Sequence, residues 1–108
     1  MGKFSVVWSD FAAYQLEITY QYLIIETNKK LASDQINQLL KATQKLTLFP
    51  NSGKLEPSLK NSKKEYRFIV KDHIKIFYTI EYDSNEIRIL DLFDSRQNPD
   101  KIKRAIDL

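Results

Sequence analysis

The hydrophobic pattern of this chain changes its period at Pro50. Between residues 11 and 49, apolar side chains recur every three or four positions, which is the spacing of one face of an α-helix. Between residues 66 and 93 they alternate with polar ones, as is typical of β-strands. A chain of 108 residues fits one compact domain, so residues 1–108 are assigned to a single domain. We therefore expect an α+β fold in which helices pack on one face of a sheet.

The N-terminal half is expected to begin with a strand and continue with a helix. Residues 3–8 are rich in β-branched and aromatic types, which favours a short strand. Ser9 or Asp10 then offers an N-cap for a helix over residues 11–26. The polar segment 27–30 is predicted to end this helix.

A second helix is expected to follow after a short connection. Ser33 or Asp34 is predicted to cap it, and Pro50 is predicted to stop it, because proline lacks the backbone N–H that a helix needs. Two helices joined in this way should form an antiparallel hairpin. Residues 50–64 contain two Pro, one Gly and several Ser and Asn, so we expect a long loop there. Loops of this length in small domains are often functional.

The C-terminal half is predicted to form three strands and a short helix. Strands are expected at 66–71 and 74–82, with a tight turn around 71–73 between them. The last strand, 87–93, is apolar on both faces and is therefore expected in the middle of the sheet. A C-terminal helix is predicted from residue 98 onward. The expected order is β-α-α-β-β-β with a helical tail, a helical hairpin packed on a mainly antiparallel sheet.

The faces of the second and third strands differ in character. The apolar face expected to meet the helices consists of Tyr66, Phe68, Val70, Ile74, Ile76, Tyr78 and Ile80. The opposite face would then carry Arg67 and Lys71 beside Lys75 and Phe77. Residues 60–78 hold six Lys or Arg against two acidic residues, within a chain of net charge +3. Such a basic patch suits nucleic acid or an acidic partner, although a solvated face of an ordinary basic domain explains it as well.

Composition excludes several classes of protein. The chain has no Cys and one His, which excludes disulfides and a Cys nucleophile and argues against a structural zinc site. It contains no phosphate-binding P-loop and no metalloprotease or nucleophile-elbow motif, so no cofactor is expected. No apolar stretch approaches the about 20 residues of a membrane-spanning helix, and no signal-peptide core is visible. We expect a cytoplasmic protein with no membrane association.

Five segments, in order along the chain, resemble one known family. They lie at residues 7–12, 48–54, 65–68, 74–80 and 89–99. The second is similar to the family's L-x-x-x-P-x-x-G-R segment, and the last to its closing I-L-x-v-x-x-x-R pattern. The chain thereby resembles the RelE/ParE superfamily of toxins from type II toxin–antitoxin systems over nearly its whole length. The fold of that superfamily agrees with the element order expected from periodicity.

The resemblance implies two modes of toxicity and several partners. RelE-like members cut mRNA in the ribosomal A site, whereas ParE-like members poison DNA gyrase. Both kinds are held inactive by a cognate antitoxin, and the pair often binds its own promoter DNA. The expected partners are therefore an antitoxin, either gyrase or ribosome-bound mRNA, and promoter DNA only through the toxin–antitoxin complex.

The nuclease mode would need cations on the scissile phosphate. By position in the family pattern, Arg67, Lys75 and Arg96 match basic residues and become the candidate catalytic residues if the chain is a nuclease. Arg67 and Arg96 are equally explained as surface charges paired with a neighbouring carboxylate, whereas Lys75 is favoured as a functional residue, through the resemblance alone. Tyr78 is expected in the core with its hydroxyl paired.

The general acid and base that RNA cleavage requires are hard to find. RelE-like nucleases commonly carry a Tyr or His in the C-terminal tail, and residues 96–102 contain neither. Phe93 and Asp94 stand where several relatives have a His. His73, Glu56 and Asp94 are the remaining candidates, and none has a spacing argument behind it. The missing base favours a ParE-like action without chemistry.

A gyrase poison needs a binding surface and no catalytic residues. Side chains expected to be exposed on the helical hairpin and the tail are Gln21, Glu26, Lys29, Lys30, Lys101, Lys103 and Arg104. The favoured prediction is a toxin that binds an essential target such as gyrase. The alternatives are a ribosome-dependent endoribonuclease, and a degenerate toxin that acts only as a binding module.

Overall fold

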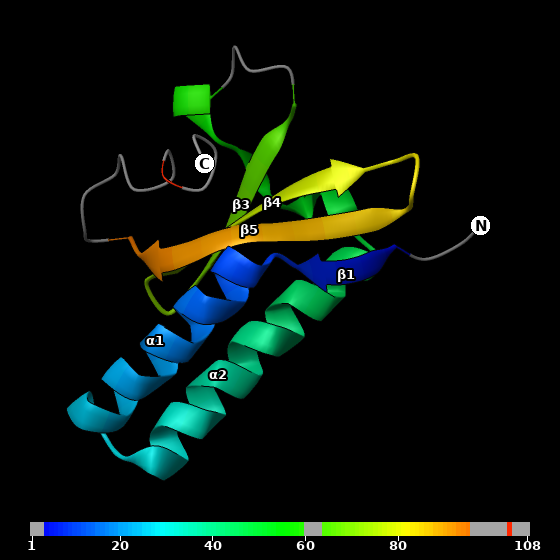
Figure 1. Cartoon of the computed structure of the whole chain (residues 1–108). Coiled ribbons are helices and arrows are strands. Elements are labelled where there is room, and N and C mark those ends of the chain that lie inside the picture. The colour runs from blue at the N-terminus through cyan, green and yellow to red at the C-terminus, as the bar shows by residue number, and fades with distance from the viewer. Residues whose placement is uncertain (1–3, 60–63, 96–103, 105–108) are drawn as a thin grey trace.

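Two helices lie side by side across one face of a five-stranded sheet in the computed structural model (Figure 1). The structure describes residues 4–59, 64–95 and 104. The helices and strands are β1 (Ser5–Trp8), α1 (Asp10–Glu26), α2 (Lys29–Gln44), β2 (Lys54–Leu55), β3 (Tyr66–Lys71), β4 (Ile74–Glu81) and β5 (Glu86–Asp94). Three short 3₁₀ helices, η1 (Lys45–Thr47), η2 (Pro50–Ser52) and η3 (Pro57–Leu59), lie between α2 and β3. The predicted α+β class and element order are confirmed, and the predicted C-terminal helix lies outside the described residues.

The capping residues decide where the two helices begin. Ser9 caps α1 as predicted, because its hydroxyl accepts a hydrogen bond from the Ala12 N–H at 3.0 Å. The prediction that Ser33 or Asp34 caps the second helix is wrong. Asn28 caps it instead, since its side chain accepts from the Leu31 N–H at 2.9 Å. The polar residues after Asn28 show no apolar spacing, which is why sequence periodicity missed the first turn of α2.

The segment after α2 is more ordered than a loop. The helix ends at Gln44, well before the predicted stop at Pro50, and η1 follows it directly. Within the predicted loop 50–64, β2 pairs antiparallel with β3 and forms one edge of the sheet. A strand of two exposed residues carries no periodic signal, so the sequence does not reveal it.

Strand β5 lies inside the sheet, as its apolar character predicted. The strand order is β1-β5-β4-β3-β2, and β5 pairs parallel with β1 and antiparallel with β4. The pairing of β4 with β5 shifts register between Phe77 and Tyr78, where Leu90 is the extra residue of a bulge. The bulge puts Ile87, Ile89 and Leu92 together on the face of β5 that meets the helices.

The sequence predicted that Tyr66, Phe68 and Val70 of β3 face the helices, and this prediction is wrong because the strand register differs by one residue. The turn between β3 and β4 consists of Asp72 and His73 alone, so Lys71 lies opposite Ile74 and Ile69 opposite Ile76. Directly opposed residues share a face, and a two-residue turn therefore places odd-numbered residues of β3 with even-numbered residues of β4. Tyr66, Phe68 and Val70 consequently lie on the face away from the helices, with Lys75 and Phe77.

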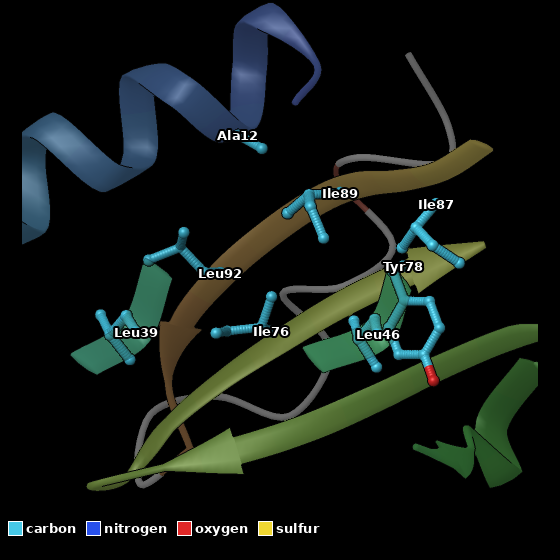
Figure 2. Packing of buried hydrophobic residues seen from close by; sticks show 8 residues of the cluster. All are labelled: Ala12, Leu39, Leu46, Ile76, Tyr78, Ile87, Ile89 and Leu92. Carbon is cyan, nitrogen blue, oxygen red and sulfur yellow. The ribbon is translucent and has the colours of Figure 1, made fainter. Parts of the chain in front are cut away.

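The main core forms between the sheet and the helical hairpin. Figure 2 shows its buried members, Ala12, Leu39, Leu46, Ile76, Tyr78, Ile87, Ile89 and Leu92. The predicted inward face of β4 is confirmed, because Ile76 and Tyr78 are fully buried there and Ile74 and Ile80 pack against them. A second, smaller cluster lies on the other face, where Phe77 and Phe93 stack with ring centroids 5.4 Å apart. Phe77 and Phe93 are buried on that face, whereas Val70 on the same face is 54% exposed, so the face is covered in part.

The β3–β4 turn is strained. Asp72 and His73 have φ angles of 49° and 68°, and neither is glycine. A two-residue turn with both φ angles positive prefers Asn-Gly, because side chains other than glycine's disfavour the left-handed region by about 1–2 kcal/mol. We expect His73→Gly to raise the free energy of unfolding by about 0.5–1 kcal/mol, once the greater freedom of glycine in the unfolded chain is deducted. Urea unfolding measures the change, and His73→Ala, which keeps the Cβ atom, should give no such gain.

Candidate functional site

Tyr78 holds the segment Pro50–Gly53 against the sheet. Its hydroxyl donates to the Pro50 carbonyl at 2.7 Å and accepts from the Gly53 N–H at 3.0 Å. Burial raises the pKa of Tyr78, which keeps the hydroxyl protonated and able to donate. The prediction that Tyr78 is a core residue with a paired hydroxyl is confirmed.

Arg67 fastens the same segment from β3. Its Nη1 donates to the Gly53 carbonyl at 2.8 Å, and its Nη2 lies 3.1 Å from a Glu65 carboxylate oxygen. Its Nε is buried and has no hydrogen-bond partner among the described residues. The register places Arg67 opposite Tyr78, on the face that meets the helices. Its guanidinium therefore binds backbone and a neighbouring carboxylate rather than facing an open basic surface.

Lys75 lies on the other face of the sheet and is also engaged. Its Nζ is 3.2 Å from Glu56 Oε1 and 4.1 Å from the centroid of the Phe68 ring. The second Glu56 oxygen accepts from the backbone N–H of Ser58 at 3.1 Å and from its hydroxyl at 2.8 Å. The ammonium is thus paired with a buried carboxylate and lies over an aromatic face. Glu56, considered from sequence as a candidate base, is the partner of this cation.

The hydrogen bonds to Glu56 make part of the stability depend on pH. Burial raises the pKa of Glu56, but the hydrogen bonds from Ser58 and the contact with Lys75 outweigh burial and lower it below 4.5. A carboxyl with a lowered pKa stabilises the fold above its unfolded pKa, and this contribution is lost as the pH falls through the folded pKa. We expect Glu56→Gln to flatten the dependence of the free energy of unfolding on pH below about 5. Urea unfolding from pH 3 to 7 measures it, and Glu17→Gln, an exposed residue of α1, should leave the slope unchanged.

The structure does not bring the three candidate cations together. Arg67 and Lys75 lie on opposite faces of the sheet, so the prediction that they share one face is wrong. The reason is the two-residue turn between β3 and β4, which sets the register of the two strands. Arg96 lies outside the described residues. His73 is exposed in the β3–β4 turn, at the opposite end of β3 from Arg67.

Sequence analysis missed an ion pair that joins β5 to Arg104. Asp91 is 0% exposed, and its two carboxylate oxygens each accept a hydrogen bond from the Arg104 guanidinium at 3.0 Å. The same guanidinium lies 5.3 Å from the Phe11 ring centroid and 5.6 Å from that of Phe93. Arg104, expected to be exposed, is therefore partly buried. An acidic residue between the apolar pairs Ile89–Leu90 and Leu92–Phe93 was the available signal, because a buried charge requires a partner.

A cleft of about 520 Å³ opens beside α1, between that helix and the ends of β4 and β5. Its walls include Ile18, Tyr22, Glu26, Asp72, Phe93 and Arg104. Of the hairpin residues predicted to be exposed, Gln21, Glu26, Lys29 and Lys30 are exposed, while Lys101 and Lys103 lie outside the described residues. Neither helix of the described chain is long and apolar enough to cross a membrane.

The fold and the sheet order define a known class of structure. The chain is similar to a solved chain of the chromosomal ParDE TA system from P. aeruginosa, with a TM-score of 0.69 and 17% sequence identity. The match covers 85% of this chain and 96% of that one. At this identity the likeness concerns the fold.

Sequence comparison gives the family. Residues 6–99 match the profile described as the ParE toxin of the type II toxin–antitoxin system parDE. The chain therefore belongs to the ParE toxin family. A search of curated proteins finds no match.

Proposed function

We propose that this toxin arrests growth by binding an essential protein such as DNA gyrase, without chemistry of its own, and that a cognate antitoxin neutralises it. The observation that supports a non-nucleolytic action is the engagement of Arg67 and Lys75 on opposite faces of the sheet. Membership in the ParE family favours the same conclusion.

The chemistry of RNA cleavage explains why this arrangement matters. Stabilising a phosphorane requires cations that converge on one phosphate within hydrogen-bond distance. Arg67 would have to leave the Gly53 carbonyl, and Lys75 would have to leave a buried carboxylate. Removing Lys75 from Glu56 would leave a buried charge unpaired, which is strongly unfavourable. A surface that binds a protein target needs none of these changes.

Induction of the chain in a bacterium separates the alternatives. RNA ends are mapped together with growth and DNA-damage signalling, and the purified toxin is added to a gyrase supercoiling assay. We expect growth arrest, damage signalling and inhibited supercoiling, without new cuts in translated codons. Lys75→Met combined with Glu56→Gln, which removes the cation without leaving the buried Glu56 charge unpaired, should preserve the arrest.

Two other outcomes would overturn the proposal. Codon-phased cuts that disappear in Lys75→Met/Glu56→Gln would establish a RelE-like, ribosome-dependent endoribonuclease. Normal growth at full expression would establish a degenerate toxin that acts as a binding module. Arg88→Met is the matched control, because the pair of Arg88 with Glu86 is a surface contact and its loss affects none of the candidate sites.

A further inference from the structure

An apolar patch, here called the end patch, lies at the end of the sheet where β1 begins and β4 ends (Figure 1). It consists of Leu48, Phe49 and Tyr82, which are 61%, 65% and 57% exposed. The Tyr82 hydroxyl lies 3.5 Å from Oδ1 of Asn51, two residues after Phe49, and this contact joins the two parts of the patch. Phe4 packs edge-on against the Tyr82 ring, with centroids 5.9 Å apart. Apolar side chains that gather in one place and stay exposed contribute little to folding and mark a binding surface.

The backbone that carries Phe49 is fixed on both sides. Its N–H donates to the Lys45 carbonyl at 3.1 Å, and its own carbonyl accepts from the Ser52 N–H at 3.0 Å. Pro50 disfavours a helical conformation for the residue before it, and Phe49 has φ and ψ of −129° and 65°. The Pro50 carbonyl is in turn held by the buried Tyr78 hydroxyl. A segment that is already ordered loses less conformational entropy on binding, so Phe49 is suited to anchor a partner.

Two free cations border the end patch. Lys41 and Lys45 are exposed and lie one turn apart at the C-terminal end of α2, and the Lys45 carbonyl also accepts from the Leu48 N–H at 3.2 Å. Neither lysine forms an ion pair within the part of the chain that the structure describes. Asp83, in the turn that follows Tyr82, is the acidic residue next along the chain to the patch. The two lysines outweigh this carboxylate, so the border is basic and favours a partner that carries acidic groups.

Resting on the function proposed above, we infer that the end patch is the surface by which the toxin binds its protein target. The occupant is an apolar pocket on the target, bordered by carboxylates that reach Lys41 and Lys45. The hydrogen bonds that keep Arg67 and Tyr78 from nuclease chemistry are the ones that hold the segment after Phe49 in place. A protein pocket suits three adjoining apolar side chains, whereas a nucleic acid would be bound chiefly by cations along its phosphates.

The test measures the concentration of the full chain that half-inhibits supercoiling by purified DNA gyrase, together with growth arrest on induction. We expect Leu48→Ser/Phe49→Ser to raise this concentration at least about 30-fold and to abolish the arrest, as expected for central apolar anchors. Lys41→Gln/Lys45→Gln should raise it about 3–10-fold and reduce its dependence on salt, because charges at the border act through screened attraction.

Matched controls separate a lost contact from a lost fold or a changed net charge. Lys29→Gln/Lys30→Gln removes two exposed cations from the other end of α2. Val70→Thr makes an exposed apolar side chain polar on the face away from the helices, without changing its shape. Both controls should inhibit within about 2-fold of the wild type. The urea midpoint of Leu48→Ser/Phe49→Ser should equal that of the wild type, because both side chains are exposed, and Phe49→Ser alone serves if the double variant unfolds.

Several results would overturn the inference in different ways. If the folded patch variant inhibits gyrase and arrests growth as the wild type does, the docking site is wrong and the proposed function stands. If that variant still arrests growth but escapes neutralisation by the protein encoded next to the toxin gene, the patch belongs to the antitoxin. If the wild type binds a DNA duplex without gyrase and the variant does not, the occupant is nucleic acid. If the wild type neither inhibits gyrase nor arrests growth, the proposed function falls together with the docking site.

Discussion

Replacing Arg104 with Ala is expected to lower the free energy of unfolding by about 2–4 kcal/mol. The substitution removes the cation that Arg104 supplies to the Asp91 carboxylate, which is 0% exposed. Removing one partner of a fully buried pair costs about 3–5 kcal/mol, and the lower end applies here because the Arg104 side chain is 32% exposed and partly screened by solvent. Lost packing against the Phe11 and Phe93 rings adds to the effect. Urea unfolding at pH 7 measures the loss.

The double variant Asp91→Asn/Arg104→Gln distinguishes an unpaired charge from lost packing. It removes both charges and keeps hydrogen-bonding groups, so it should recover a substantial part of the stability that Arg104→Ala loses. Arg104→Lys should fall between the wild type and Arg104→Ala, because one ammonium cannot make the two parallel hydrogen bonds of a guanidinium. The single variants Asp91→Asn and Arg104→Gln complete the cycle. If their losses of stability simply add up to the loss in the double variant, Arg104 and Asp91 do not act as a pair.

Local sequence signals were sufficient to predict those features of the fold that depend on a single helix or strand. The N-cap Ser9, the inward face of β4 and the interior position of β5 follow from residue types and spacing. The ParE-like fold agrees with them and with the family profile. These features need no knowledge of how distant segments meet.

Pairing between strands determined what the sequence could not predict. The two-residue turn fixes which β3 residues face the helices, and this one-residue difference moves Arg67 away from Lys75. The bulge at Leu90 reverses the alternation within β5 and turns Asp91 away from Ile89. Simple alternation would have placed Asp91 on the same face as Ile89, the face that meets the helices. The candidate site therefore differs from its prediction at the points where register changes.

The Pro-x-x-Gly segment that resembles the family pattern has a packing explanation. Gly53 has an ordinary extended backbone with φ of −75°, so its role is not conformational freedom. A Cβ atom at this position would meet the Tyr78 hydroxyl, and would lie 2.7 Å from Tyr78 Cε1 and 2.8 Å from the Phe68 carbonyl oxygen. The Tyr78 ring is fully buried and the carbonyl belongs to β3, so neither has room to move aside.

Gly53→Ala is accordingly expected to destabilise the fold by about 2–4 kcal/mol, through overpacking and through weakening of the hydrogen bonds that Gly53 donates to the Tyr78 hydroxyl and accepts from Arg67. Tyr78→Phe alone should cost about 1–2 kcal/mol, because it leaves the Pro50 carbonyl and the Gly53 N–H without their partner. In the double variant the closest obstruction is gone, so its loss should be smaller than the sum of the two single losses. The contacts with the ring carbon Cε1, which Phe retains, and with the Phe68 carbonyl remain, and the rescue is therefore partial. Ser52→Ala, an exposed neighbour, should change the free energy of unfolding by less than about 0.5 kcal/mol. Strict additivity in this cycle would mean that the glycine is required for a reason other than its contact with Tyr78.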